Sequence, residues 1–412
     1  METVPLFLNK RELLFSLIAL FCLFILSFSY EFYKYEKLVQ NPTFYTQAQV
    51  LSVTKKLSKK DKPYISYKLK SDDLIFYTIR WKAQEIKNAS LVRVGFLTKN
   101  ISFYNYFRGF FAPSIYMELI QEAKEDFAHL HVKAQHSKVS LQELYGALFF
   151  ADSYDKQMRH DISKWGIAHL VAISGFHLGI LSAILYFLLK PLYMFFQDKF
   201  FPYRNSFADL ALLVFVILGA YVFYISAVPS VLRAYVMSLV GFLLFSRNIK
   251  IVSFGTLFFT MAFVLILFPK LLFSVAFWFS IAGVFYIFLF LYHFSYLSKV
   301  AIFIFINFWV YILMLPIVHY VFDIFTYYQL LSPLISMAFV VFYPLSLILH
   351  VINLGGVFDN IIESFLAFEM QILSLHVSLN FLVGYVVLSL LAIRYKYVAY
   401  LLPLIALSTF FI

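Results

Sequence analysis

The sequence predicts an α-helical polytopic membrane protein that carries a small extracytoplasmic β domain. Apolar residues make up 62% of the 412 residues and charged residues only 13%, and the mean hydropathy is +0.82, so most of the chain is expected in lipid. The net charge is +11, and residues 44–108 hold thirteen basic side chains against four acidic ones. This polar, basic segment predicts a separate domain whose partner is a polyanion or an anionic membrane surface.

The first element is an apolar stretch near the N-terminus. Residues 13–30 are long enough to span a bilayer at about 1.5 Å per residue. Lys10 and Arg11 precede it and favour a cytoplasmic N-terminus, although two lysines on the other side weaken this bias. A cleaved signal peptide is the alternative, but no small-residue cleavage site follows. We therefore expect a retained membrane anchor over residues 1–31.

Residues 40–110 are expected to form the β domain. The segments YTQAQVLSV, KPYISYKLK, LIFYTIRW and LVRVGFLT alternate or are rich in β-branched and aromatic residues, and lysine-rich or Asp-containing turns separate them. Their spacing fits a five-stranded, OB-like barrel. Interleaved aromatic and basic side chains suit base stacking and phosphate contacts in single-stranded DNA. The candidate DNA-binding residues are Tyr64, Tyr67, Lys68, Arg80, Trp81 and Lys82. Alternatively, the aromatic rings form the barrel core and the lysines are merely solvated.

Residues 111–165 read as a polar helical connector. Charged and apolar positions mix as in amphipathic helices that lie at the membrane interface or pack under the barrel. His129, His131 and His136 suggest a metal site, but no carboxylate or cysteine completes a recognisable spacing. An exposed amphipathic helix accounts for them, and we expect neither a metal nor a cofactor.

The stretch 166–181, GIAHLVAISGFHLGIL, places polar residues in an otherwise apolar region. A polar group in hydrocarbon is costly, so His169, Ser174 and His177 should face protein or a wet cavity. Ser174 can cap a following helix and Gly175 tolerates unusual backbone geometry, so a new helix is expected to begin here. Its N-terminus would favour an anion such as a phosphodiester.

Small residues follow this break at helical spacing. Gly175, Gly179, Ser182 and Ala183 fall on one face, which would let another helix approach closely. The less specific interpretation is that the two glycines form only a GxxxG packing contact, and that both histidines are satisfied core residues.

Residues 166–412 are expected to form one polytopic domain. Prolines interrupt most of its apolar segments, at Pro229, Pro269, Pro316, Pro333 and Pro344, and indicate kinked helices around a cavity. Further spans are predicted near residues 207–227, 229–246, 251–268, 271–292, 299–320, 330–350, 377–393 and 396–412.

Arg233 lies about one turn inside one of these segments. An uncompensated cation is expensive there, so its guanidinium should meet an anion, carbonyl groups or water. It could face translocated phosphates or pair with Asp209. Alternatively, it snorkels to the interface.

Residues 146–181 resemble the signature of the ComEC competence-channel family, whose members carry a sequence of the type G-hHLLAISGLHVGLL. Pro229, Ser230, Arg233 and Ala234 resemble a second family motif, PSS-lRA, and the likeness extends from residue 44 to about 350. The chain departs from the family at residues 150–153, where FADS replaces a turn of the type GdrS and loses its glycine. The match to the signature comprises His169, Ala172, Ile173, Ser174, Gly175, His177 and Gly179.

The resemblance implies a multi-pass channel in the bacterial inner membrane that carries single-stranded DNA into the cytoplasm during natural transformation. It implies a periplasmic OB-like domain. The partners it implies are a periplasmic DNA receptor and cytoplasmic DNA-binding or motor proteins, and it is compatible with a homo-oligomer. The channel residues would be His169, Ser174, Gly175, His177, Gly179 and Arg233.

Catalytic motifs are missing from the sequence. Many ComEC relatives end in a metallo-β-lactamase-like domain, but this chain has no HxHxDH cluster, so we expect a short form that cleaves no DNA. No glycine precedes a lysine, which excludes a GxxxxGK loop. Two other functions stay open: a transporter for a small anion with His177 as a proton-linked site, and a membrane-embedded hydrolase that uses His169 and His177. A small-anion transporter has no need of the basic β domain, and a hydrolase should lose activity on His177→Ala while it retains substrate binding.

Overall fold

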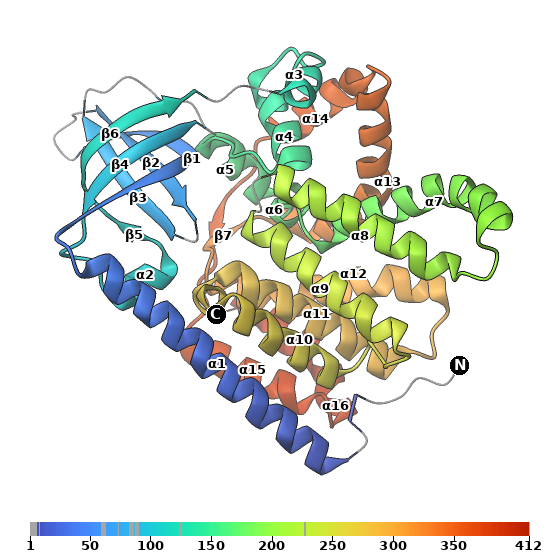
Figure 1. Cartoon of the computed structure of the whole chain (residues 1–412). Helices are drawn as coiled ribbons and strands as arrows, with labels where there is room; N and C mark the ends of the chain where they lie inside the picture. Colours follow the sequence, from blue (N-terminus) through green and yellow to red (C-terminus); the bar gives the residue numbers. More distant parts are fainter. Residues whose placement is uncertain are drawn as a thin grey trace. The chain divides into compact units, whose positions relative to one another are not determined.

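The computed structural model describes residues 6, 7, 9–58, 63–72, 74–81, 86, 90–122, 126–225 and 228–411. The chain forms two compact units (Figure 1). The barrel unit comprises Asn9–Leu130 and Ala262–Val275, and the helical unit comprises Met1–Leu8, His131–Met261 and Ala276–Ile412.

The barrel unit begins with the predicted anchor. Helix α1 runs over Lys10–Val39 and is long and apolar enough to cross a membrane. No residue of its most apolar stretch is buried inside the chain, as expected for a helix that faces lipid. The Ser27 hydroxyl donates to the carbonyl of Ile266 at 2.6 Å, which satisfies one polar group in this apolar helix.

Six strands follow in a sheet of order β5-β3-β2-β1-β4-β6. All neighbours are antiparallel except β3 and β5, which run parallel. The two edge strands are successive parts of one chain segment, so the sheet closes on itself; the Ala112 amide donates to the Tyr77 carbonyl at 2.9 Å at this closure. The strands are β1 Thr43–Leu57, β2 Pro63–Ser71, β3 Leu74–Trp81, β4 Leu91–Leu97, β5 Phe110–Phe111 and β6 Ser114–Gln121.

Strand β6 corrects one expectation, because the sequence predicted an amphipathic helix over these residues. The segment pairs with β4, with Arg93 opposite Glu118 and Val94 opposite Met117. Met117 is the one buried residue of β6 and belongs to the barrel core, whereas the rest of the strand is exposed or half-buried. The free edge of β4 therefore outweighs the local helical preference of this segment.

A buried carboxylate joins three helices of the barrel unit. These are α1, the short helix α2 (Phe103–Arg108) and the 3-10 helix η1 (Pro269–Phe273). Glu31 is buried and accepts a hydrogen bond from the Tyr106 hydroxyl at 2.9 Å. Lys34 and Lys270 lie 3.0 and 3.4 Å from its carboxylate oxygens. Burial of this acid is balanced by two cations and a hydroxyl donor.

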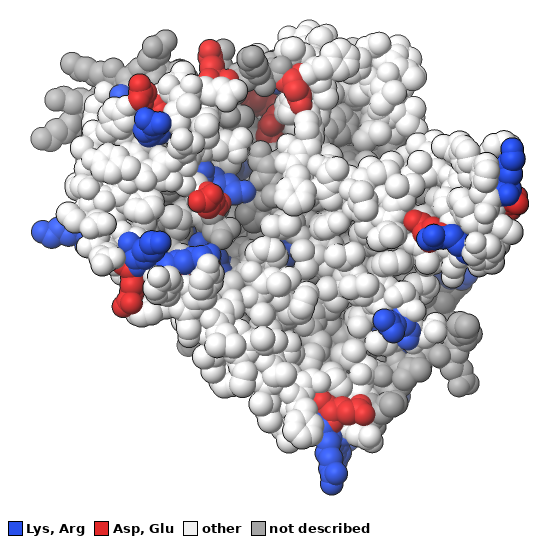
Figure 2. Space-filling model, viewed as in Figure 1, with Lys and Arg blue, Asp and Glu red and all other residues white. Residues whose placement is uncertain are grey.

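The helical unit consists almost entirely of helices (Figure 1). Six helices in the described part of the chain are long and apolar enough to cross a membrane: α1, α7, α8, α11, α12, and α13 together with η2. Figure 2 shows few charged side chains over the helices of this unit on the face drawn, as lipid-facing surface requires. The elements are α3 Phe127–Lys133, which begins in the barrel unit, α4 Val139–Phe150, α5 Lys156–Lys164, α6 Ala168–Val171, α7 Gly175–Phe200, α8 Ser206–Tyr224, α9 Pro229–Ser246, α10 Phe254–Leu267, which ends in the barrel unit, α11 Val275–Phe294, α12 Lys299–His319, β7 Ile324–Phe325, η2 Tyr327–Leu331, α13 Ser332–Val351, η3 Gly355–Phe358, α14 Asp359–Leu366, β8 Leu373–Ser374, α15 Leu379–Leu391, α16 Lys396–Leu407 and η4 Ser408–Phe411.

The prolines have two different roles in these helices. Pro229, Pro269 and Pro333 stand in the first turn of α9, η1 and α13, where a missing amide proton costs nothing. Pro316 and Pro344 lie inside α12 and α13. The sequence predicted a kinked span at all five positions, and at the first three the proline instead marks where a helix starts.

Candidate functional site

The polar stretch at the centre of the chain is a break between two helices. Helix α6 ends at Val171, and the backbone is extended at Ala172 and at Ser174, where φ is −134° and ψ is 179°. Helix α7 then begins at Gly175, which confirms the predicted helix start. The Ser174 amide donates to Nδ1 of His177 at 3.2 Å, so the histidine side chain folds back over the start of its own helix.

His177 is enclosed by aromatic rings. Its ring is fully buried and meets Tyr343 edge to face at 4.6 Å and Phe339 at 5.5 Å. Because Nδ1 accepts the Ser174 proton, the neutral ring carries its own proton on Nε2, and this atom has no hydrogen-bond partner among the described residues. An enclosed ring does not suit the transporter or hydrolase alternatives, both of which need His177 to reach a solute.

The small-residue face of α7 is open. A Cβ atom on Gly179 would meet no atom within 4 Å, and one on Gly175 would meet only the Ala234 Cβ, at 3.7 Å. The predicted close helix contact is therefore wrong at Gly179 and is an ordinary contact at Gly175. His169 is also exposed, and its Nε2 lies 3.4 Å from the Ser336 hydroxyl.

Arg233 is a buried cation. Its side chain is 7% exposed, and it makes no hydrogen bond or ion pair with any described residue; Nε in particular has no partner. Its guanidinium carbon lies 6.0 Å from the centroid of the Phe277 ring, which is a weak cation–π contact.

Asp209 is not the partner of Arg233. It accepts hydrogen bonds from Nε and Nη2 of Arg204 at 2.6 and 2.7 Å, and from the Tyr193 hydroxyl. Arg204 stands five residues earlier in the turn between α7 and α8, so it reaches the carboxylate locally. The suggested pairing of Arg233 with Asp209 is wrong, and Arg233 has no anionic partner among the residues that the structure describes.

Helix α9, which carries Arg233, packs against the start of α7. A Cβ atom on Gly175, the first residue of α7, would lie 3.7 Å from the Ala234 Cβ. The first turn of a long helix has free amide groups and a partial positive charge. Helix N-termini and arginine side chains are both groups that bind phosphates in proteins.

A second candidate surface lies on the outer side of strands β2 and β3. Tyr64 is opposite Trp81 and Lys68 is opposite Tyr77 in the register. The Tyr64 and Trp81 ring centroids are 5.2 Å apart, and the Lys68 ammonium lies 5.9 Å from the Tyr77 centroid. Trp81 is 51% exposed and Tyr77 is 39% exposed. Tyr77 was absent from the predicted set, although the two-residue period places it beside Trp81.

The remaining predicted barrel residues do not lie on this surface. Tyr67 is fully buried and its hydroxyl accepts a hydrogen bond from the Ile86 amide at 3.4 Å, so it belongs to the barrel core and its assignment to DNA binding is wrong. Arg80 is half-buried opposite Ile65, on the side of the sheet that Tyr67 occupies. Lys82 lies outside the described residues. Alternation along a strand separates neighbours that look equivalent in sequence.

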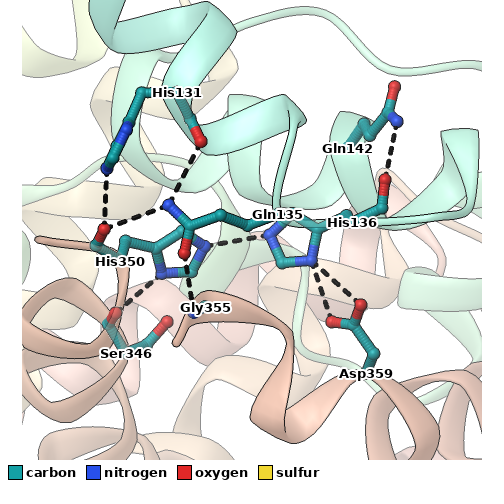
Figure 3. A network of polar contacts seen from close by, with 8 residues as sticks. All are labelled: His131, Gln135, His136, Gln142, Ser346, His350, Gly355 and Asp359. Atoms are coloured by element: carbon teal, nitrogen blue, oxygen red, sulfur yellow. Dashed lines mark hydrogen bonds and ion pairs between the residues drawn. The ribbon is translucent and has the colours of Figure 1, made fainter. Parts of the chain in front are cut away.

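The connector histidines also differ from expectation. His129 pairs with Asp126, with 2.7 Å between Nδ1 and Oδ1. His136 is buried in a polar network with residues far along the chain (Figure 3), so an exposed amphipathic helix does not account for it. No group of three or more His, Cys, Asp or Glu side chains in the described residues is arranged to hold a metal ion.

A known family model matches most of the helical unit. The family model described as competence protein matches residues 148–412, well over half of the chain, from the end of α4 to the C-terminal residue. The match includes the helix break at Ser174 and the buried Arg233. No curated protein and no solved structure matches the chain. The chain thus belongs to the competence protein family, as its resemblance to ComEC predicted.

Proposed function

We propose that this chain is an inner-membrane channel that takes up single-stranded DNA during natural transformation. Membership of the competence family and six helices able to span a membrane support the proposal. In this arrangement the N-terminus is cytoplasmic and the barrel lies in the periplasm, where it receives one strand. A periplasmic receptor would deliver the DNA, and cytoplasmic DNA-binding or motor proteins would draw it in, because the sequence has no GxxxxGK loop.

The strand order supports an OB-like barrel. Strand β1 pairs with both β2 and β4, and β3 pairs with β5 in parallel. If β5 and β6 are counted as one bent strand, the result is a five-stranded closed barrel of the OB type. In OB folds the face of strands 2 and 3 binds oligonucleotides, and here that face carries the Tyr64–Trp81 ring pair.

This ring pair with its neighbouring lysine is the observation that carries the proposal. Bases of any sequence can stack on Trp81 and Tyr77, because each base has a π face. Lys68 lies one strand away from Tyr77 and can meet a phosphate while a base covers the ring. The combination gives sequence-tolerant binding of a single strand, whereas the bases of a duplex are already stacked.

Within the helical unit, the open face of α7 and the unpaired Arg233 support a path for the strand. Gly175 and Gly179 expose bare backbone, which leaves room for a bulky polymer. A phosphate that met Arg233 would supply the anion this buried cation lacks, and the positive end of α7 would add to the attraction.

The test is binding of labelled oligonucleotides to the full chain in detergent, measured by fluorescence anisotropy over a salt series. We expect preference for single strands, and a loss for Trp81→Ala of about 1–3 kcal/mol, roughly 5- to 150-fold in Kd. Lys68→Met should lower the slope of log K against log salt by about 0.7. Tyr116→Ala is the matched control, because Tyr116 is 43% exposed on β6 but is bonded to Glu118.

Equal binding of duplex and single strand, or a Trp81→Ala variant that binds like the parent, would contradict the proposed receiving face. Loss of binding in Tyr116→Ala of the same size would place the contact elsewhere on the barrel.

A further inference from the structure

A row of polar contacts lies at the C-terminal end of helix α13 (Figure 3). Asp359 contacts Nδ1 of His136, at 2.9 Å from Oδ1 and 3.1 Å from Oδ2. Nε2 of His136 lies 2.9 Å from Nε2 of His350. Nδ1 of His350 lies 2.7 Å from the carbonyl oxygen of Ser346. Three contacts thus follow one another from the carboxylate to the backbone carbonyl.

Each contact needs one hydrogen, and the ordinary forms of these groups supply too few. The Ser346 carbonyl can only accept, so His350 carries a proton on Nδ1. A carboxylate also only accepts, so His136 carries a proton on Nδ1 as well. With both rings neutral, two lone pairs would then face each other across 2.9 Å. A neutral Asp359 that donated to His136 would resolve this, but it brings the same additional proton.

We propose that Asp359, His136 and His350 form a proton-binding site that holds one proton more than a carboxylate and two neutral imidazoles. The three contacts need three hydrogens, and the two neutral rings provide two. The additional proton makes the site electrically neutral, because it balances the carboxylate charge. This neutrality suits the burial of His136 and His350, which are both 4% exposed.

The surroundings hold the two rings in place. Tyr145 stacks on His136 with ring centroids 4.3 Å apart, and its hydroxyl has no hydrogen-bond partner among the described residues. Nε2 of His131 lies 2.9 Å from the His350 carbonyl oxygen, and the side-chain amide of Gln135 donates to the same oxygen at 3.0 Å. The titratable groups around the two rings are thus Asp359, Tyr145, which also lies 4.6 Å from the His350 ring, and His131.

Protons can reach the site through Asp359, whose side chain is 16% exposed while that of His136 is fully buried. His350 stands one residue before the end of α13, which at about 1.5 Å per residue is long enough to cross the bilayer core. The site therefore lies at one end of a candidate span, where water can exchange protons with the carboxylate.

Helix α13 connects this site with the broken helix. Ser336 contacts His169, and both Phe339 and Tyr343 pack on His177. These residues and His350 repeat at intervals of three, four and seven, so they share one face of α13. Loss of the proton leaves two lone pairs opposed at one end of that face, and the contact between α13 and the connector must loosen.

Thermal unfolding of the full chain in detergent between about pH 5 and about pH 9 tests the site. The folded chain holds the additional proton and an unfolded chain does not above about pH 6.5. Above that pH the unfolded chain therefore binds fewer protons at these residues than the folded site does, and stability falls as rising pH removes the proton from the site. Below it both free imidazoles gain a proton, two against the one that the site holds, so stability falls again towards acid pH. Above about pH 6.5 we expect the Tm of the parent to fall by several degrees relative to that of His350→Gln, because the glutamine amide can donate to His136 without an additional proton.

Asp359→Asn provides a second variant if His350→Gln does not fold. Its side-chain amide can donate to Nδ1 of His136, so that a neutral His136 donates to Nε2 of His350 without the additional proton, and the fall in Tm at high pH should disappear. His160→Gln, at a half-exposed histidine, should leave the profile unchanged. Parallel profiles for the parent and both site variants would overturn the proposal. A Tm raised by added Zn²⁺ in the parent but not in His350→Gln would also overturn it, in favour of a metal ion between the two Nε2 atoms.

Discussion

Replacement of Arg233 by methionine should make the protein more stable and less active. The guanidinium is buried and lacks an anion among the described residues. A charged side chain at the centre of a membrane helix costs about 2.5–3.5 kcal/mol on insertion scales. Arg233 stands one turn from the start of α9, so this is an upper value, and the contact with Phe277 returns about 0.5–2 kcal/mol. Methionine has a similar length and no charge, so Arg233→Met should gain up to about 3 kcal/mol, or a few degrees of Tm.

The measurement combines unfolding of the purified chain in detergent with transformation frequency in a competent host that depends on this chain. We expect a higher Tm together with a fall in transformation of about tenfold or more, because one charge-assisted phosphate contact is worth about 1.5–3 kcal/mol. Arg247→Met is the matched control, since Arg247 caps the exposed end of the same helix. It should change neither quantity, as is usual for surface substitutions.

The sign of the change in Tm decides between two accounts of Arg233. Removing one member of a buried ion pair destabilises a protein by about 3–5 kcal/mol, because the other charge is left alone. A lower Tm for Arg233→Met would therefore mean that the guanidinium has a protein partner, and our reasoning about a free cation would be refuted. A higher Tm with unchanged transformation would refute the phosphate contact alone.

Two further predictions concern packing and a buried charge. Gly355→Ala should lower the free energy of unfolding by about 1–3 kcal/mol, and with it the Tm, because its new Cβ would lie 2.6 Å from the His350 ring. Gly179→Ala should leave the Tm unchanged, because a Cβ there meets nothing within 4 Å. Equal Tm changes in the two variants would contradict this packing. Glu31→Gln should cost about 1.5–3 kcal/mol, because Tyr106 and two lysines lose a charged partner. Glu36→Gln, at an exposed position of the same helix, is its control in the same unfolding assay, and a matching loss there would show that the buried cluster is not the cause.

The helices and the central break could be predicted because lipid imposes a simple rule. Every backbone polar group must be satisfied within the segment, so spans appear as long apolar runs. Helices α11, α12 and α13 fall within a few residues of the predicted spans at 271–292, 299–320 and 330–350. The start of α7 could also be predicted, because a serine followed by a glycine, as at Ser174, is unusual inside an apolar run and is typical of a helix start.

The barrel was harder to predict because pairing between distant strands decides which segments become strands and which side chains face the core. Strand β6 reads locally as an amphipathic helix and becomes a strand only because β4 offers it an edge. Tyr67 and Lys68 are equally suited to DNA binding in the sequence, yet one is in the core and the other is outside. A register fixed by the whole sheet decides which of two neighbours faces solvent.

The proton-binding site was harder still to predict, because its residues are even further apart in the sequence. His136 is 214 residues from His350 and 223 residues from Asp359 in the sequence. No spacing rule joins them, and in the connector His136 looks like any polar residue of an amphipathic helix. A membrane chain nevertheless offers an indirect signal, because a histidine at the end of an apolar span must find a partner or water. His350 meets that condition, and its partner could be found only once the fold had brought α13 beside the connector. The sequence can therefore indicate which polar residues of a membrane helix need an explanation, whereas the identity of the partner, and with it the chemistry of the site, depends on tertiary structure.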